Sequence, residues 1–189
     1  THGRPGPVWI DIPMDVQGVE CFSIEDAVKR AKRPLILAGN GINCAQAREE
    51  FKFFVDQTNI PVVTSYNGVD LISSDDRNYV GRVGVKGTRA GNFAMQNCDL
   101  LLVIGCRLPV PVTGYNYKTF AREAEVIVVD IDKDEHSKDT VKIDRFINRD
   151  AKNFLDLYWF DRSKSDWNYL CEEWKEKWPV CPTKNPSEK

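Results

Sequence analysis

Short apolar runs alternate with helix-like segments along most of this chain. The apolar runs predict strands over residues 8–12, 35–38, 61–64, 100–104 and 126–132. The segments between and after them predict helices over residues 24–31, 44–58, 88–97, 120–124, 149–158 and 167–178. Because the strand segments are apolar on both faces, we expect an α/β fold in which helices cover both sides of a parallel sheet.

The alternation of apolar strand segments and helices ends after Tyr158, where we place a domain boundary. Residues 1–158 form the α/β domain in this interpretation. Residues 159–189 contain a linker, an amphipathic helix and a polar tail that we expect to be disordered. A tryptophan-rich stripe on this helix should be buried against the sheet domain, a second copy of the chain or a neighbouring domain. The stripe consists of Trp167, Leu170, Cys171, Trp174 and Trp178.

Three predicted strands end in residues that suit a ligand. Gly39-Asn40-Gly41 lets a backbone approach a phosphate or ribose closely, although a tight turn alone also explains it. Arg107 follows a second strand, where it fits a phosphate or simply an exposed surface. Asp130 and Asp132 end a third strand, where they would accept hydrogen bonds from ribose hydroxyls or cap the next turn.

Composition and charge exclude several classes of partner and site. The formal net charge is -2, with both signs interspersed, which gives no reason to expect a nucleic acid or an anionic membrane as partner. No apolar run approaches the ~20 residues that span a bilayer. None of the six cysteines lies in a C-x-x-C pair, and His2 and His136 have no evident partner in the sequence, which argues against a zinc site. We expect a reducing, cytoplasmic compartment.

Several segments together resemble the central domain of acetolactate synthase and its thiamine-diphosphate-dependent relatives. They follow one another in that family's order and near its spacing, from Gly3 to Leu157. The segments are residues 3–13 (GRPGPVWIDIP), 33–41 (RPLILAGNG), 97–107 (NCDLLLVIGCR), 112–114 (VTG) and 128–132 (VVDID).

The resemblance implies a six-stranded parallel sheet with helices on both faces, a Rossmann-like fold related to the DHS-like nucleotide-binding fold. It also implies N-terminal and C-terminal neighbour domains that bind thiamine diphosphate and magnesium. The family's G-D-G…N-N motif belongs to the C-terminal domain, and no Gly-Asp-Gly occurs here. We therefore expect this chain alone to bind no thiamine diphosphate and to catalyse nothing. The longer parent would be a homo-oligomer that decarboxylates a 2-oxo acid and transfers the product to an acceptor.

In flavin-bearing relatives the central domain holds FAD. By matching motif positions, the resemblance places the nucleotide contacts on Gly39, Gly41, Ser65, Tyr66, Gly84, Lys86, Gly105, Arg107 and Asp130. The synthases carry F-D-D-R before V-T-G, whereas this chain has Leu108-Pro109-Val110-Pro111. The prolines remove backbone donors and the charged side chains are gone. We expect any nucleotide held here to be ADP-like and flavin not to be held firmly.

Two alternatives belong to other functional classes. A stand-alone NAD-binding protein related to the sirtuins is one, because Gly39-Asn40-Gly41-Ile42-Asn43 is similar to G-A-G-[IV]-S. The only His-Gly pair, however, is His2-Gly3, and the zinc-binding C-x-x-C pairs of that class are missing. A non-enzymatic module that joins neighbouring domains is the other.

Overall fold

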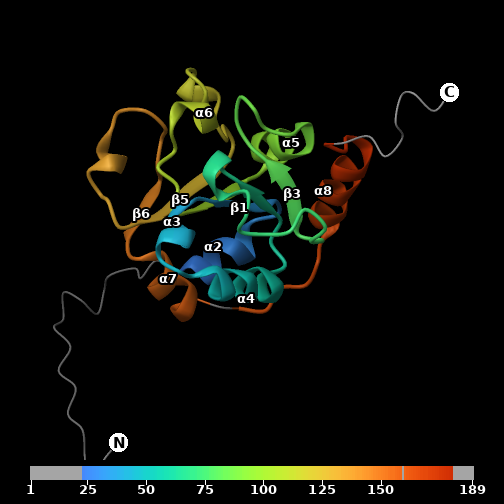
Figure 1. The fold of residues 1–189 in the computed structure, drawn as a ribbon, viewed down its shortest axis with the longest axis horizontal. Coiled ribbons are helices and arrows are strands. Elements are labelled where there is room, and N and C mark those ends of the chain that lie inside the picture. The colour runs from blue at the N-terminus through green and yellow to red at the C-terminus, as the bar shows by residue number, and fades with distance from the viewer. Residues whose placement is uncertain (1–22, 159, 181–189) are drawn as a thin grey trace, which may run out of the picture.

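The computed structural model of the chain describes residues 23–158 and 160–180. Six parallel strands form one sheet in the order β3-β2-β1-β4-β5-β6 (Figure 1). The strands are β1 (Pro34–Ala38), β2 (Val62–Thr64), β3 (Tyr79–Arg82), β4 (Leu100–Ile104), β5 (Glu125–Asp130) and β6 (Arg145–Asn148). The first half of the chain adds strands outward from β1 on one side, and the second half adds them outward from β4 on the other. The expected six-stranded parallel sheet is confirmed, and β1 and β4 flank the point where the strand order reverses.

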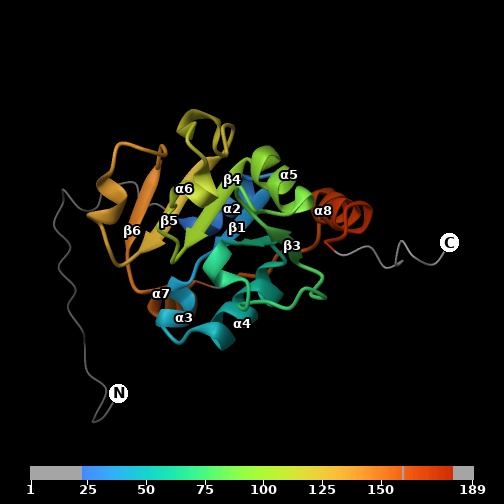
Figure 2. The same ribbon diagram turned by 45° about the horizontal axis from the view of Figure 1, so that its top comes forward.

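Helices cover both faces of this sheet, as expected. Helices α2, α3, α4 and α7 lie on one face, and α5, α6 and α8 lie on the other (Figures 1 and 2). The α-helices are α2 (Ile24–Arg30), α3 (Gly41–Cys44), α4 (Arg48–Thr58), α5 (Arg89–Asn97), α6 (Val110–Thr113), α7 (Ala151–Leu157) and α8 (Asp166–Lys177). Short 3-10 helices are η1 (Tyr66–Gly68), η2 (Tyr117–Thr119) and η3 (Glu135–Ser137).

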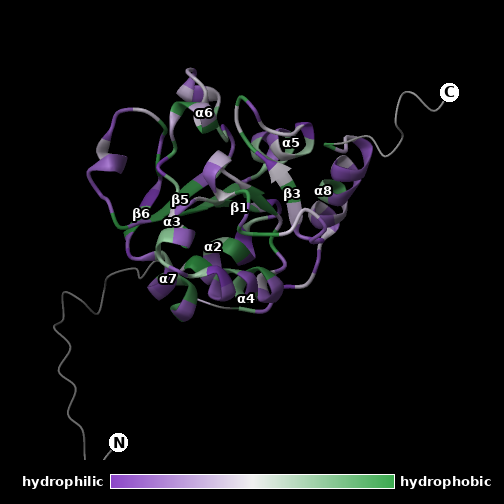
Figure 3. Ribbon diagram, in the orientation of Figure 1, coloured by the Kyte–Doolittle hydropathy of each residue, from purple (hydrophilic) through white to green (hydrophobic). Residues whose placement is uncertain are grey.

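The central strands are apolar throughout because each of their faces meets a separate hydrophobic cluster. On β1, Ile36 points into the cluster formed with α2, α4 and α7, whereas Leu35 and Leu37 point into the cluster formed with α5 and α8. Successive side chains of a strand point to opposite faces, so a strand covered on both sides needs apolar residues at every position. Figure 3 shows the resulting band of hydrophobic strands between helices of mixed polarity.

The two edge strands were not predicted. β3 and β6 have only four residues each, and their burial is partial. β6 reads Arg-Phe-Ile-Asn, with both ends exposed, so it shows neither a continuous apolar run nor a clear alternation. The strand predicted over residues 8–12 lies outside the described residues, as does His2.

Two predicted helices differ from the structure. The helix expected over residues 44–58 begins only at Arg48, because Gln46 adopts a φ of 53° and turns the chain between α3, which ends at Cys44, and α4. The helix expected over residues 120–124 is wrong: these residues form a turn after η2, and Ala121 has a φ of 42°. A positive φ at a non-glycine residue cannot be foreseen from local propensity.

Helix α8 packs on the sheet domain beside β3 and α5 (Figure 1). Trp167 and Cys171 are buried in the cluster around α5, and Trp174 packs against that cluster. The indole Nε1 of Trp167 donates a hydrogen bond to the carbonyl of Pro34, the first residue of β1, at 2.9 Å. The prediction that this stripe is covered is confirmed for these residues and is wrong for Leu170, which is 37% exposed. The boundary between residues 158 and 159 stays a prediction.

Candidate functional site

The ends of the two central strands approach each other through glycines. The Gly39 amide donates to the Ile104 carbonyl at 2.9 Å, and the Gly41 amide donates to the Gly105 carbonyl at 2.8 Å. A Cβ on Gly41 would lie 2.6 Å from the Gly105 Cα, and Gly105 itself has a φ of 58°. Larger residues would push the strand ends apart. The glycines thus join the carboxyl ends of β1 and β4 at the switch point, where open α/β sheets bind their ligands.

A pocket of about 870 Å³ opens over this switch point. Its volume is within the range of roughly 300–1,000 Å³ that is typical of cofactor sites. Six of the nine predicted contact residues line it, namely Gly41, Ser65, Tyr66, Gly105, Arg107 and Asp130. The structure therefore brings together residues from four strand ends, those of β1, β2, β4 and β5.

The other three predicted residues, Gly39, Gly84 and Lys86, are not among those that line the pocket. A Cβ on Gly39 would clash with the Gly105 carbonyl. Gly84 has a φ of 99°, and a Cβ there would clash with the carbonyl of Pro111. Both glycines are therefore explained by close packing. Lys86 is exposed. Binding by these three residues stays a prediction.

Ser65 and Tyr66 form the part of the pocket that follows β2. The Ser65 amide donates to the carbonyl of Ala38 at 2.9 Å, which joins the end of β2 to the end of β1. Tyr66 is exposed, and the guanidinium carbon of Arg82 lies 5.4 Å from the centre of its ring. A ring held in this way offers an aromatic surface to a ligand at the pocket rim.

Asp130 and Asp132 both cap the turn that follows β5. Oδ1 of Asp130 accepts a hydrogen bond from the Asp132 amide at 3.0 Å, and Oδ1 of Asp132 accepts one from the Glu135 amide at 3.0 Å. The strand predicted to reach Asp132 ends at Asp130 for this reason. The capping interpretation is confirmed for both acids. A ribose-binding role for Asp130 stays a prediction.

His136 is a partner of Asp130 that the sequence did not reveal. Its Nε2 lies 3.4 Å from Oδ2 of Asp130, its side chain is only 3% exposed, and its ring packs on Phe146. Burial raises the pKa of Asp130, but the contacts with His136 and the backbone amide of Asp132 outweigh it and hold the pKa below its usual value. No partner for His136 was evident in the sequence, because the two residues meet only when the turn after Asp130 folds the chain back.

Arg107 is paired with Glu135 across the pocket. Its Nη2 lies 2.9 Å from Oε2 of Glu135, and the other carboxylate oxygen lies 2.5 Å from Nζ of Lys138. Hydrogen bonds from the two cations lower the pKa of Glu135 to about 2. Arg107 itself is 73% exposed, whereas Glu135 is 14% exposed. Glu135 and Lys138 also line the pocket, and neither was predicted to do so.

One wall of the pocket consists of the segment Leu108-Pro109-Val110-Pro111. Leu108 is buried with a φ of 49°. The Pro109 carbonyl accepts a hydrogen bond from the Val112 amide at 2.7 Å, and the Pro111 carbonyl accepts one from the Val85 amide at 2.9 Å. This wall therefore presents apolar side chains, and the carbonyls of Pro109 and Pro111 already have donors.

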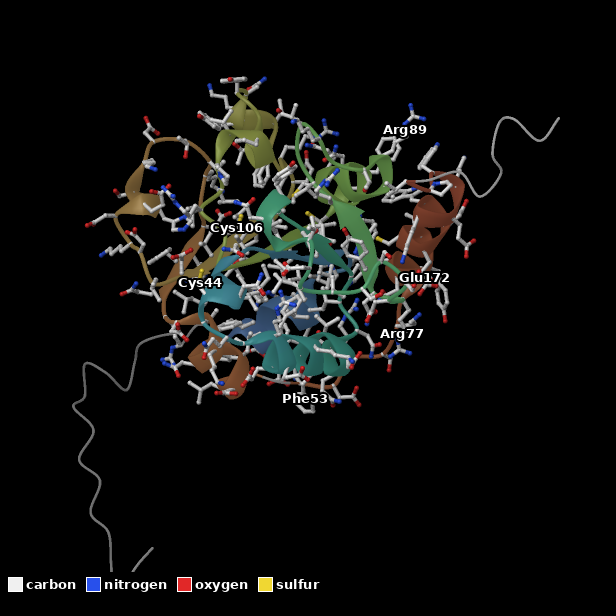
Figure 4. The ribbon with its side chains drawn as sticks, viewed as in Figure 1. Cys44, Phe53, Arg77, Arg89, Cys106 and Glu172 are labelled. Carbon is white, nitrogen blue, oxygen red and sulfur yellow. The ribbon has the colours of Figure 1, made fainter. Side chains whose placement is uncertain are left out.

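Two cysteines also line the pocket, Cys44 on α3 and Cys106 after β4 (Figure 4). Cys44 is exposed, whereas Cys106 is buried, and burial raises the pKa of the Cys106 thiol to about 11. Within residues 23–158 and 160–180, no group of three or more histidines, cysteines or acids could hold a metal ion. In the same part of the chain, no helix is long and apolar enough to cross a membrane.

Comparison with known proteins gives consistent matches. Residues 23–157 match the family model for the central domain of thiamine pyrophosphate enzymes. The chain is 38% identical over 182 residues to a probable acetolactate synthase large subunit of Methanocaldococcus jannaschii, which covers 82% of this chain and 30% of that protein. It is 35% identical over 156 residues to the acetolactate synthase isozyme 2 large subunit of Escherichia coli (strain K12). This match covers 72% of this chain and 28% of that protein.

A plant relative gives the same result. The chain is 34% identical over 164 residues to "Probable acetolactate synthase 2, chloroplastic" of Oryza sativa subsp. japonica, covering 73% of this chain and 24% of that protein. This chain thus spans about 30% of the length of the first curated relatives that it matches. The matches confirm the family resemblance of the sequence motifs and support neither the sirtuin-related alternative nor the non-enzymatic one.

Proposed function

Because this chain belongs to the central-domain family of thiamine pyrophosphate enzymes, we propose that it holds an ADP-like nucleotide within a longer enzyme of the acetolactate synthase kind. In this proposal the chain is a non-catalytic, nucleotide-binding part of that enzyme. Neighbouring N-terminal and C-terminal domains of the same protein bind thiamine diphosphate and magnesium. The cofactor, when bound there, supplies the chemistry for decarboxylating a 2-oxo acid and joining the remaining fragment to an acceptor.

The observation that carries the nucleotide proposal is the convergence of Arg107 and Asp130 on one pocket at the switch point. Arg107 follows β4 and Asp130 ends the adjacent strand β5, so a cation and an acid lie side by side at the sheet's carboxyl edge. A guanidinium fits a diphosphate, and an acid at a strand end fits the ribose hydroxyls of the same ligand. The close backbones of Gly41 and Gly105 leave room for the phosphates.

The wall Leu108-Pro109-Val110-Pro111 favours ADP over FAD. An isoalloxazine ring carries several hydrogen-bonding groups that need partners when they are buried. The carbonyls of Pro109 and Pro111 already accept hydrogen bonds from Val112 and Val85, and the prolines have no N–H to donate. A flavin ring against this wall would lose hydrogen bonds of about 0.5–1.5 kcal/mol each, whereas an ADP moiety needs only the polar side of the pocket.

Calorimetric titration of the purified chain with ADP and with FAD tests the proposal. We expect a colourless protein that binds ADP saturably and FAD no more tightly than ADP. Arg107→Gln should weaken ADP binding about tenfold, since it removes a charge-assisted hydrogen bond to phosphate. Arg122→Gln is the matched control, because Arg122 is an exposed arginine that does not line the pocket. It should change the affinity by less than about twofold.

Two results would contradict this proposal. A yellow preparation that releases stoichiometric FAD on denaturation would show that flavin is the resident nucleotide. ADP binding that is absent at millimolar concentrations, or is equally sensitive to Arg122→Gln and Arg107→Gln, would remove the nucleotide site as we assign it.

We further propose that the longer enzyme is a homo-oligomer in a reducing, cytoplasmic compartment. The compartment is supported by the cysteines, of which Cys44, Cys98, Cys106 and Cys171 are free thiols in the described part of the chain. Titration of this chain with thiamine diphosphate and magnesium should show no saturable binding, because the motifs that bind them belong to the neighbouring domains.

A further inference from the structure

An acidic residue in the turn between β5 and β6, Glu135, forms ion pairs with the cations that line the pocket. Glu135 uses both carboxylate oxygens, one for Arg107 at 2.9 Å and one for Lys138 at 2.5 Å. Arg107 and Lys138 are the arginine and the lysine that line the pocket in the described part of the chain. A phosphate group that bound here would compete with Glu135 for the same donors.

Glu135 is held in this position by its own backbone. Its amide donates to Oδ1 of Asp132 at 3.0 Å, and the Asp132 amide in turn donates a hydrogen bond to Oδ1 of Asp130. The neighbouring residue His136 is buried against Phe146. The turn is therefore anchored on both sides of Glu135, which holds the backbone of Glu135 where its carboxylate reaches Arg107.

The charges that line the pocket also disfavour an anion. Its carboxylates are Asp130, Asp132 and Glu135, which outnumber the cations Arg107 and Lys138. Without Glu135 the two signs would balance, and both cations would lose their partner. Glu135 thus weakens the binding of a diphosphate in two ways. It competes for the two cations, and its negative charge repels the phosphates.

We propose that Glu135 is an intramolecular competitor of the nucleotide phosphates and sets the affinity of the pocket by occupying Arg107. The inference rests on the proposed nucleotide site, which it deepens by naming the residue that limits binding. In the opposite role, a carboxylate holds an arginine in the orientation that a ligand needs. The two roles predict opposite effects when the carboxylate is removed.

Titration calorimetry with ADP on Glu135 variants separates these roles. Glu135→Gln keeps the size of the side chain and removes its charge, so we expect ADP to bind about tenfold more tightly. Asp134→Asn is the matched control, because Asp134 is an exposed acid on the same turn that does not line the pocket. It should change the affinity by less than about twofold. Glu135→Ala provides a second variant, and thermal melting confirms that each protein is folded.

The gain should depend on Arg107. In an Arg107→Gln background, Glu135→Gln should tighten ADP binding by less than it does in the wild type, because the competed guanidinium is gone and only the release of Lys138 and the lost repulsion remain. Equal or weaker binding by folded Glu135→Gln and Glu135→Ala would overturn the inference, as would an equal gain from Asp134→Asn. If wild type binds ADP through Arg107 but Glu135→Gln does not gain, the inference fails and the proposed function stands. If neither wild type nor Glu135→Gln binds ADP, both fail.

Discussion

Replacing Trp167 by phenylalanine should lower the free energy of unfolding of this chain by about 2–3 kcal/mol. Trp167 lies in the first turn of α8 and is 3% exposed. Its Nε1 donates to the Pro34 carbonyl at 2.9 Å, and its ring meets that of Trp174 edge to face, with the centres 5.7 Å apart. It is therefore the side chain through which α8 is joined to β1, a central strand.

The magnitude is the sum of two losses. A buried hydrogen bond contributes about 1 kcal/mol, and phenylalanine cannot replace the indole donor. The smaller ring also leaves a space in a packed cluster, and a loss of that size costs about 1–2 kcal/mol when the surroundings relax only in part. For a chain of this length, the sum corresponds to a fall in Tm of about 5–10 °C.

Urea unfolding followed by circular dichroism measures this difference. Trp178→Phe is the control, because Trp178 is the C-cap of α8 and is only partly buried, with its ring 4.9 Å from that of Phe93. It should cost less than about 1 kcal/mol. If Trp167→Phe costs no more than Trp178→Phe, then α8 does not unfold together with the sheet. The reasoning from the structure would be refuted, and the domain boundary after Tyr158 would gain support.

Two further predictions concern protonation and thiol reactivity. The pKa of Glu135 is about 2 in the folded chain against 4.5 for the free group, so its ion pairs stabilise the fold above pH 4.5 and less as the pH falls towards 2. Wild type should melt above Glu135→Gln at pH 7 and converge with it near pH 2; a constant gap would contradict the pairing. Native alkylation, read by peptide mass spectrometry, should modify Cys44 and spare the buried thiols until denaturant is added, and early modification of the latter would contradict their burial. The buried thiols are Cys98, Cys106 and Cys171.

The central strands were predictable because burial on both faces requires a continuous run of apolar residues, which is visible in the sequence. Residues of β1 and β4 are buried at every position, and both strands are read directly from their apolar runs. The edge strands β3 and β6 each pair with one neighbouring strand and are only partly buried, so their sequences lack a continuous apolar run. Their place in the sheet follows from pairing with β2 and β5, which is a tertiary effect.

The glycines of the site were predictable as a group but not in their roles. Gly41 and Gly105 line the pocket, whereas Gly39 and Gly84 make room for neighbouring backbone. Both roles require the absence of a Cβ, so the residue type is the same in either case. Only the atoms that face each glycine distinguish the two, and these come from distant parts of the chain.

The charged residues were harder to interpret, because their partners determine what they offer to a ligand. Arg107 and Glu135 are 28 residues apart in the sequence and meet only when β4 and β5 pair and the following turn folds back. A lone arginine at a strand end predicts a phosphate site, whereas an arginine that already has a carboxylate partner predicts a weaker one. If the proposed nucleotide site is correct, the affinity of this pocket for an anion depends less on how many cations line it than on whether Glu135 can be displaced from them.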